Sequence, residues 1–447
     1  MFRTNKDTLE ASDVKEFIEE HKKLVPRYQI LQKYYEGKHK ILNKKKVGTA
    51  PCNNLVNPFP KYITDMLTGY LVGQPALYSA VDNDSEEDDD FLIELMNIFR
   101  FNNEQEVNLE IAKSFSIKGE VLEHLWSNED GNIRFKPMQP DEAFLIYDNT
   151  LEDEVKFAIR YFTLKEDGED VLYAYVYDKH NIFIFNDKLG QLSLSEIDDH
   201  SFQEVPFILY ENNKEHLGDF ETVMSLVDAY DLAQSNTLND MEQFTDAYLV
   251  LINMGGTDDD DVDNMKKKRT MLVDGDGDAK WLIKDVNDAW VENYKNRIKK
   301  DIHKFSGTPD MSDETFGSSL SGVSLRYKLL AMEQIRANKE RKFKKGLFRR
   351  IELISNFLGI TNQELTFTGI DIQFNSTLPQ NVLEIAQVIN LLRPILPDET
   401  LIEQLYFVDN AKEEMKKKRI ELEDELGSYP DFFNSMKADD EDGEEKV

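Results

Sequence analysis

The longest helical pattern in the sequence covers residues 321–358, and it restricts the possible folds more than any other segment. These 38 residues contain no proline, and apolar side chains recur in steps of three and four, the period of one helix face. A helix of this length would extend about 57 Å, whereas an average globular helix has about 11 to 12 residues. So long a rod predicts a subunit of a large assembly.

The predicted rod is basic although the chain is strongly acidic. Ten lysines and arginines oppose three glutamates within it, so the rod carries +7 in a chain of net charge −33. This charge could contact nucleic acid phosphate, pair with acidic surfaces of neighbouring copies, or form a solvated helix face. Because apolar residues such as Leu347 and Ile351 interleave with the charges, the pattern favours contacts on more than one face, as in an oligomer. The basic candidates are Lys342, Lys344, Lys345, Arg349 and Arg350.

Composition excludes several classes of protein. At 447 residues the chain exceeds what one core normally covers, so two or more structural units are expected. A surface this acidic repels nucleic acid, so any DNA contact must be local or weak. The single cysteine, Cys52, excludes an intramolecular disulfide framework and favours cytosolic assembly. Since the sequence has no apolar signal core and no run of about 18 apolar residues, we expect neither classical secretion nor a membrane span.

Periodicity separates helical from sheet-forming stretches. Short runs rich in β-branched and aromatic residues predict antiparallel strands between residues 133 and 207, and Ile370–Phe374 predicts a further strand. Residues 271–282 predict a hairpin that turns on Asp274–Asp278. Helices are expected over residues 12–36, where Pro26 can divide the helix, and over 61–72, 91–99, 219–244, 290–305, 382–392 and 398–405.

No arrangement of residues in the sequence indicates catalysis. A Walker phosphate loop, a Gly-x-Ser-x-Gly elbow and a His-Glu-x-x-His helix are all missing, and the seven histidines are scattered singly. Asp274, Asp276, Asp278 and Asp285 have the spacing of calcium-loop ligands, but Ala279 stands where that loop requires glycine, which favours a plain hairpin. We therefore expect no catalytic, cofactor or metal site, and a protein that is not an enzyme.

Six segments are diagnostic by their order along nearly the whole chain. They are Asn53–Asn57 with Tyr62–Pro75, Asp246–Leu251, Pro309–Asp313, Ser321–Lys328, Leu378–Asn381 and Asp398–Leu405. In these segments the chain resembles the portal proteins of tailed double-stranded DNA bacteriophages, in the branch found in siphophages of Gram-positive hosts. None of the segments is a catalytic motif, so the specificity lies in their conjunction.

The resemblance implies a homo-oligomeric ring, a dodecamer, at the unique portal vertex of the virion, assembled in the host cytoplasm. Such a ring nucleates head assembly, lets the terminase motor package DNA, releases DNA on ejection and joins the head to the tail. The implied partners are double-stranded DNA, the terminase large subunit, a head-completion (connector) protein, and the major capsid and scaffolding proteins. No membrane and no cofactor are implied.

The resemblance also implies an α+β, mainly helical subunit with named regions. These are an α/β wing (residues 1–217), a first stem helix (218–252), a clip (253–287), a second stem helix (288–306) and a tunnel loop (307–322). They continue with a long helix (323–359), a strand returning to the wing (360–378), a helical crown (379–435) and a disordered acidic tail (436–447).

The resemblance assigns two sets of contact residues. Those of the tunnel loop would face DNA, and those of the clip would contact terminase or the connector. Two alternatives remain: a minor capsid or scaffold protein that pairs through the long helix, and a metal-dependent DNA-processing enzyme, for which carboxylate abundance is the only support. The tunnel-loop set is Thr315, Phe316, Gly317, Ser318, Ser319, Ser321 and Gly322, and the clip set is Lys266, Lys267, Lys268, Arg269, Asp274 and Asp276.

Overall fold

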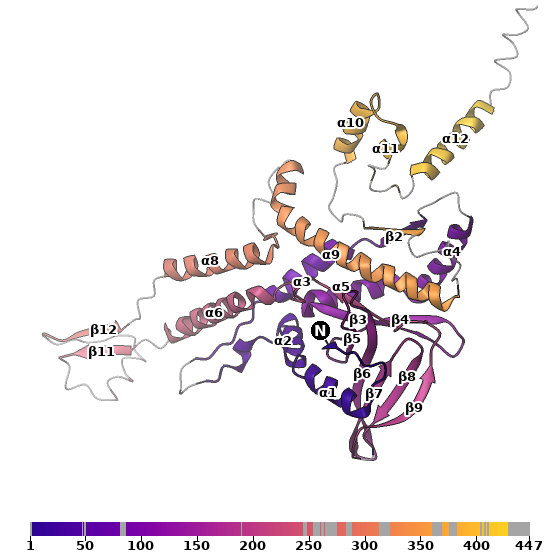
Figure 1. The fold of residues 1–447 in the computed structure, drawn as a ribbon. Helices are drawn as coiled ribbons and strands as arrows, with labels where there is room; N and C mark the ends of the chain where they lie inside the picture. Colours follow the sequence, from indigo (N-terminus) through magenta and orange to yellow (C-terminus); the bar gives the residue numbers. More distant parts are fainter. Residues whose placement is uncertain are drawn as a thin grey trace, which may run out of the picture.

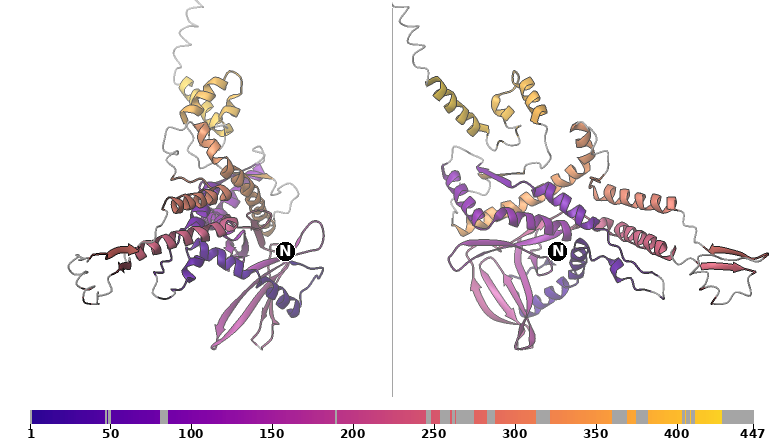
Figure 2. Two further views of the ribbon diagram at one scale, coloured as in Figure 1. Left: turned by 90° about the vertical axis from the view of Figure 1, so that its left-hand side faces the viewer. Right: turned by 180° about the vertical axis from the view of Figure 1, so that it is seen from behind.

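A computed structural model of the chain shows an α+β subunit with a compact body, a projecting arm and a long helix across both (Figures 1 and 2). The structure describes residues 2–427 except 47, 49–50, 81–85, 189, 245–247, 254–259, 261–262, 264–274, 283–287, 313–321, 360–368, 375–381, 403–404, 406–407 and 409–410. The predicted acidic tail lies outside the described residues.

The body, residues 2–220, contains two sheets packed against each other. The first has six strands in the order β1-β5-β6-β7-β8-β9, and the second has three in the order β10-β3-β4. Side chains of both, including Leu122, Tyr177 and Phe207, form one buried cluster between them. The strands are β1 (Phe2–Arg3), β3 (Glu120–Ser127), β4 (Ile133–Met138), β5 (Ala143–Tyr147), β6 (Val155–Glu166), β7 (Glu169–Tyr177), β8 (Asn181–Asn186), β9 (Ser193–Asp199) and β10 (Phe207–Glu211). The predicted antiparallel strands are therefore present, although β1 pairs with β5 in parallel.

Helices cover the body on several sides. The expected helix over residues 12–36 is divided into α1 (Ala11–His21) and α2 (Val25–Tyr35), because Pro26 occupies the first turn of α2, where its missing N–H has no intrahelical partner. Val14 and Ile18 of α1 pack on the larger sheet. The helices α3 (Phe59–Val72), α4 (Glu86–Phe101) and α5 (Glu104–Lys118) follow. The sequence pattern did not predict α5, whose Ile111, Ala112 and Phe115 are fully buried.

The arm consists of α6 (Met224–Phe244) and α8 (Asp288–Ser306), which pack side by side, with a two-stranded sheet at its far end (Figure 1). The short 3-10 helix η2 (Glu221–Val223) leads into α6. The expected first stem helix over 218–252 is too long: the helix ends at Phe244, and β11 (Tyr248–Ile252) is a strand because its apolar run pairs with β12 (Asp278–Leu282).

The hairpin predicted over residues 271–282 also needs correction. Its second half is β12, whose partner among the described residues is β11, about 30 positions earlier in the chain. Residues 271–274, which would form the first half, lie outside the described residues.

The long helix α9 (Gly322–Phe357) has 36 residues and agrees with the prediction to within one residue at each end. Its Leu329 and Met332 pack in one buried cluster with Ile298 and Ile302 of α8. Its Phe343, Leu347, Ile351, Leu353 and Ile354 belong to a second cluster in the body. The expectation that apolar groups on both sides of this helix serve an oligomer is therefore wrong for these residues, because the subunit's own core buries them. The same burial argues against the coiled-coil scaffold alternative.

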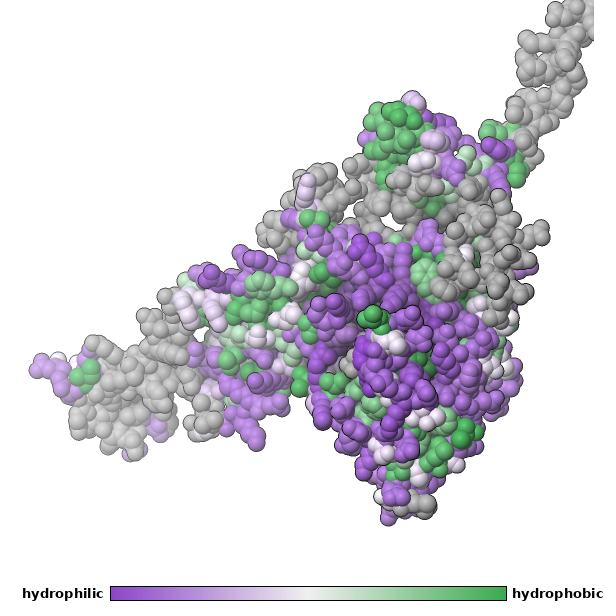
Figure 3. Space-filling view, in the orientation of Figure 1, coloured by the Kyte–Doolittle hydropathy of each residue, from purple (hydrophilic) through white to green (hydrophobic). Residues whose placement is uncertain are grey.

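The last described part lies beyond α9 (Figure 1). The predicted strand Ile370–Phe374 is β13, which pairs in antiparallel fashion with β2 (Ala76–Ala80). The predicted helices are α10 (Val382–Leu392) and α11, which ends earlier than expected (Asp398–Ile402), and α12 (Ala411–Gly427) was not predicted. Apolar side chains gather on the surface of α10 and the turn after it (Figure 3), where Leu391 and Ile395 are about three-quarters exposed, at 75% and 74%.

No helix in the described part of the chain is long and apolar enough to cross a membrane. Among these same residues, histidine, cysteine and carboxylate side chains form no group of three that could hold a metal ion.

Candidate functional site

The segment that leaves the arm toward the predicted tunnel loop is held in place by α3 and α8. Tyr62 of α3 donates a hydrogen bond from Oη to the carbonyl of Pro309 at 2.7 Å and accepts one from the Met311 amide at 3.2 Å. His303 of α8 donates from Nδ1 to the carbonyl of Thr308 at 3.2 Å. We call Thr308–Ser312 with these partners the loop anchor.

Asp310 is the charged centre of the loop anchor. Its Oδ2 lies 2.7 Å from Lys299 Nζ and 3.9 Å from His303 Nε2, and its Oδ1 accepts bonds from the Ser312 amide and hydroxyl at 3.1 and 2.6 Å. Burial opposes ionisation of Asp310, but the bonds from Lys299 and Ser312 outweigh it and lower its pKa to about 2. Burial lowers the pKa of His303, with Asp310 acting against this effect. Asp310 is therefore ionised at neutral pH and pairs there with Lys299.

Most of the predicted tunnel-loop and clip residues lie outside the described residues. This applies to the loop residues from Thr315 to Ser321 and to the clip residues Lys266–Arg269 and Asp274. Gly322 is the first residue of α9. Asp276 lies in an exposed turn before β12, where its carbonyl accepts a hydrogen bond from Asn253 Nδ2 at 3.3 Å. Of the predicted loop, residues 307–322, the described residues thus include the first part, 307–312, and the last residue, Gly322.

The basic residues of α9 differ in their surroundings. Lys342 pairs with Glu211 of β10, and Arg349 pairs with Glu204 and lies 2.6 Å from Glu352. Lys344 lies 3.4 Å from Glu340 and 5.9 Å from the ring of Phe374. Lys345 is exposed. Much of the positive charge of the helix is therefore matched by carboxylates of the same chain.

Arg350, predicted as a contact residue, is instead buried in the body. Its side chain has no exposed surface, and its Nη2 lies 2.8 Å from Glu123 Oε1. Its Nη1 donates to Asn108 Oδ1 at 2.9 Å and lies 3.4 Å from Glu104. Burial alone would lower the pKa of Arg350, but Glu123, Tyr210 and Glu104 raise it, so the guanidinium stays charged inside the body. It cannot reach DNA or a neighbouring subunit from there.

A second polar arrangement, along α6, was not found from the sequence. The extended segment 53–57, which we call the strap, donates backbone N–H bonds to three side chains of α6. The amides of Asn53, Leu55 and Asn57 bond to Asn239, Ser235 and Asp231 at 2.7, 2.9 and 2.7 Å. Four residues of helix rise about 6 Å and two residues of extended chain about 6.6 Å, so the two spacings match.

Asp231, which holds the strap, also forms a buried pair with His39, the residue before the short 3-10 helix η1 (Lys40–Asn43). His39 Nδ1 lies 2.6 Å from Asp231 Oδ2, and neither side chain is exposed. The other oxygen of Asp231 accepts from both the amide and the side chain of Asn57. The signal in the sequence was the spacing of four between Asp231, Ser235 and Asn239, which places three short polar side chains on one helix face.

Comparison with known proteins identifies the family. Residues 14–427 match the family described as "Phage portal protein, SPP1 Gp6-like". The chain belongs to this family of phage portal proteins. As a portal-family member, it is a structural, non-enzymatic component of the virion capsid, and the family implies a homo-oligomeric ring. The resemblance inferred from the six ordered segments is thereby confirmed.

Two curated relatives agree with this assignment. The portal protein of Bacillus phage SPP1 is 25% identical over 425 residues, which cover 89% of this chain and 81% of that protein. The portal protein of Clostridium phage phiCD119 is 26% identical over 448 residues, which cover 92% and 96%. Both phages infect Gram-positive hosts, as the sequence analysis expected.

Among solved structures, a chain from the neck of an empty GTA particle has a TM-score of 0.47 and 11% identity, covering 77% of this chain and 89% of that one. A chain from the virion of a native gene transfer agent particle has a TM-score of 0.45 and 11% identity, covering 76% and 85%.

The Lys299–Asp310 ion pair of the loop anchor should make the stability of the protein depend on pH in the acid range. Because the folded-state pKa of Asp310 lies below its ordinary value of 3.8, the pair stabilises the fold above that value, and the contribution is lost as the pH falls toward 2. We expect Asp310→Asn to lower the free energy of unfolding by less than about 1 kcal/mol at pH 7, since the pair is partly exposed. The difference from wild type should vanish near pH 2.

Urea unfolding at several pH values measures this difference. Asp301→Asn is the matched control, because Asp301 lies on α8, the helix that carries Lys299, and has no ion pair among the described residues. A gap between Asp310→Asn and wild type that stayed constant down to pH 2 would contradict the assigned role of the ion pair.

Proposed function

We propose that this portal-family chain forms the ring-shaped channel through which double-stranded DNA enters the capsid under a terminase motor and later leaves it. The proposal includes nucleation of head assembly and joining of the head to the tail through a connector protein. The observation that supports it best is the family match over residues 14–427, combined with the arm and long helix that converge on the loop anchor. In this proposal the ring is a dodecamer at the unique vertex.

The regions of the subunit then take the following roles. The body corresponds to the wing, α6 and α8 to the stem, and the far end of the arm with β11 and β12 to the clip. The segment between the loop anchor and α9 is the proposed tunnel loop, α9 is the long helix, and α10–α12 form the crown. The proposed clip contacts with terminase or the connector involve Lys266–Arg269, Asp274 and Asp276.

Charge supports a conduit that does not hold DNA. A protein that neutralises phosphates releases counterions and gains salt-dependent affinity, which would slow translocation. The net charge of −33 makes the protein repel DNA. Lys342, Lys344 and Arg349 already form ion pairs with carboxylates of the same chain. Small polar residues and glycines between Thr315 and Gly322 suit transient contacts with a moving duplex. Among the candidates Lys342, Lys344, Lys345, Arg349 and Arg350, Lys345 is exposed and is therefore the best placed for a contact outside the subunit.

Negative-stain microscopy of the purified protein tests the assembly. Ring-shaped particles with an axial hole are expected. Particles that remain monomeric, or that lack a hole at every salt concentration, would contradict the proposal.

Removal of the proposed tunnel loop separates its role from that of the ring. We expect deletion of residues 315–321 to leave rings intact but to abolish most DNA packaging, because the remaining anchor and α9 carry the packing contacts. DNA protected from nuclease inside assembled heads is the measurement. Deletion of the seven residues 440–446 is the length-matched control and should package normally. Loss of rings with folded monomers would instead assign the loop a structural role.

A further inference from the structure

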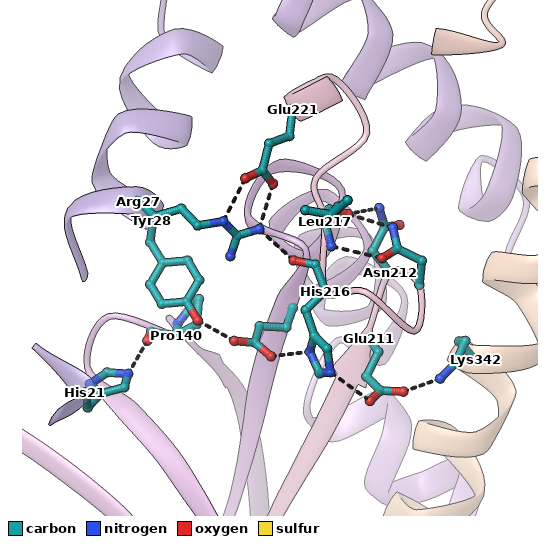
Figure 4. Close-up of polar contacts among 12 residues, drawn as sticks. His21, Arg27, Tyr28, Pro140, Glu211, Asn212, His216, Leu217, Glu221 and Lys342 are labelled. Atoms are coloured by element: carbon teal, nitrogen blue, oxygen red, sulfur yellow. Dashed lines mark hydrogen bonds and ion pairs between the residues drawn. The ribbon is translucent and has the colours of Figure 1, made fainter. Parts of the chain in front are cut away.

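A network of charged side chains joins the body, the arm and α9 around His216 (Figure 4). His216 lies in the linker between β10 and η2, which carries the chain from the body into the arm. Its backbone carbonyl accepts a hydrogen bond from Arg27 Nη2 of α2 at 2.6 Å, and Arg27 also holds Glu221 of η2 through Nε and Nη2, at 2.7 and 2.6 Å. The residue therefore sits where the three parts of the subunit meet.

Both ring nitrogens of His216 face carboxylates. Nδ1 lies 2.5 Å from Glu120 Oε2 at the start of β3, and Nε2 lies 3.4 Å from Glu211 Oε1 at the end of β10. A neutral imidazole has one N–H and one lone pair, so one of these carboxylates would face a lone pair. Only the imidazolium presents an N–H to both oxygens. The geometry thus selects the protonated form.

The second oxygens of the two carboxylates are also occupied. Glu120 accepts a hydrogen bond from Tyr28 Oη of α2, and Glu211 pairs with Lys342 of α9. Neither carboxylate can therefore turn freely to compensate for the loss of the imidazolium. The charged and titratable groups around His216 are Arg27 and Tyr28 from α2, Glu120 from β3, Glu211 from β10, Glu221 from η2 and Lys342 from α9.

We propose that His216 is a proton-operated clamp, which ties the linker to β3 and to β10, and through Glu211 to Lys342 of α9, when it is protonated, and which loosens the linker when the proton is lost, because a neutral imidazole donates to only one of the two carboxylates. The hydrogen bond from His216 to Glu120 outweighs burial and raises the pKa of His216 above its ordinary value of 6.5. A group with a raised folded-state pKa stabilises the fold fully below its unfolded pKa, and this contribution is lost as the pH rises through the folded value. The clamp is therefore closed near pH 6 and opens as the pH rises through the raised pKa of His216.

Opening has a local effect because the rest of the junction does not depend on His216. The Asp219 amide still donates to the Ser116 carbonyl at 2.8 Å, and the Asn212 amide to the Gly119 carbonyl at 2.9 Å. These bonds hold the two ends of the linker to the body. Loss of the proton thus loosens residues 213–218 between two fixed points rather than separating the arm from the body.

Hydrogen–deuterium exchange of the full-length protein between pH 6 and 9, read by mass spectrometry and corrected for intrinsic exchange, tests the clamp. The protection of the amides of residues 213–218 should fall roughly tenfold as the pH rises, the size expected from one charge-assisted hydrogen bond. His216→Gln should show the low protection at pH 6 already, with no further change. His180→Gln, at an exposed histidine in another turn of the body, is the control and should follow wild type.

Glu211→Gln provides a second variant that keeps His216 and its backbone. With one carboxylate replaced by a neutral amide, the loss of protection should begin at a lower pH than in wild type. Constant protection of residues 213–218 across the range in wild type would overturn the proposal. So would a pH dependence in His216→Gln equal to that of wild type.

Discussion

Replacement of Arg350 by methionine is expected to lower the free energy of unfolding by about 3 to 5 kcal/mol, the usual cost of removing one partner from a buried ion pair. The guanidinium lies at 0% exposure between Glu123 and Glu104, whose side chains are 0% and 6% exposed. Methionine would fill similar space but leave these carboxylates without a cation. Urea unfolding monitored by circular dichroism measures the loss.

Arg341→Met is the matched control, because Arg341 is an exposed arginine of the same helix. We expect it to change stability by less than about 0.5 kcal/mol. The triple variant Arg350→Met, Glu123→Gln, Glu104→Gln should recover much of the loss, since it removes the uncompensated charges as well. Equal stabilities of the Arg350 and Arg341 variants would refute the account of the buried cluster.

Gly119→Ala is expected to cost about 3 to 5 kcal/mol, from backbone strain and a steric clash together. Gly119 has a φ of +90°, and a Cβ added there would lie 2.0 Å from the carbonyl oxygen of His216. That oxygen belongs to the backbone, so no side chain can move aside. The backbone around Gly119 and the linker around His216 must therefore move apart where the linker crosses the start of β3.

Gly168→Ala isolates the clash from the strain. Gly168 has a φ of +91° in the turn between β6 and β7, and an added Cβ would meet nothing within 4 Å. The alanine there should cost about 1 to 2 kcal/mol from the left-handed backbone alone. Thermal and urea unfolding of both variants give the difference. Similar losses in the two variants would show that the close approach at Gly119 has no energetic weight.

The sequence predicted those elements whose apolar residues recur with a clear helical or strand period. The bounds of α9 follow from a long run without proline, and β13 and α10 follow from clear alternation and helical spacing. The helix α5 was not predicted because it is buried on several sides. Polar residues such as Glu104, Asn108 and Lys118 lie inside, so the helix has no separate polar and apolar faces.

The candidate site shows the limit of reading charge from sequence. Arg349 and Arg350 are neighbours in a basic run, yet the first is partly exposed and the second is fully buried. What distinguishes them is the position of Glu123 and Glu104, which are 227 and 246 residues away in sequence. Local pattern carries no information about partners so distant. The loop anchor is similar, since Tyr62 bonds to Pro309 across 247 residues.

The route of α9 through two separate hydrophobic clusters has a mechanical consequence. Met332 lies in a cluster that joins Ile298 and Ile302 of the arm to the body helix α3, and Leu347 lies in the core of the body, 15 positions or about 22 Å further along one unbroken helix. A continuous helix held at two points resists bending between them, because a kink would break its backbone hydrogen bonds. The arm therefore cannot swivel on the linker alone. A force applied at the loop end of the subunit is transmitted through α9 to the body, and the linker carries little of that force.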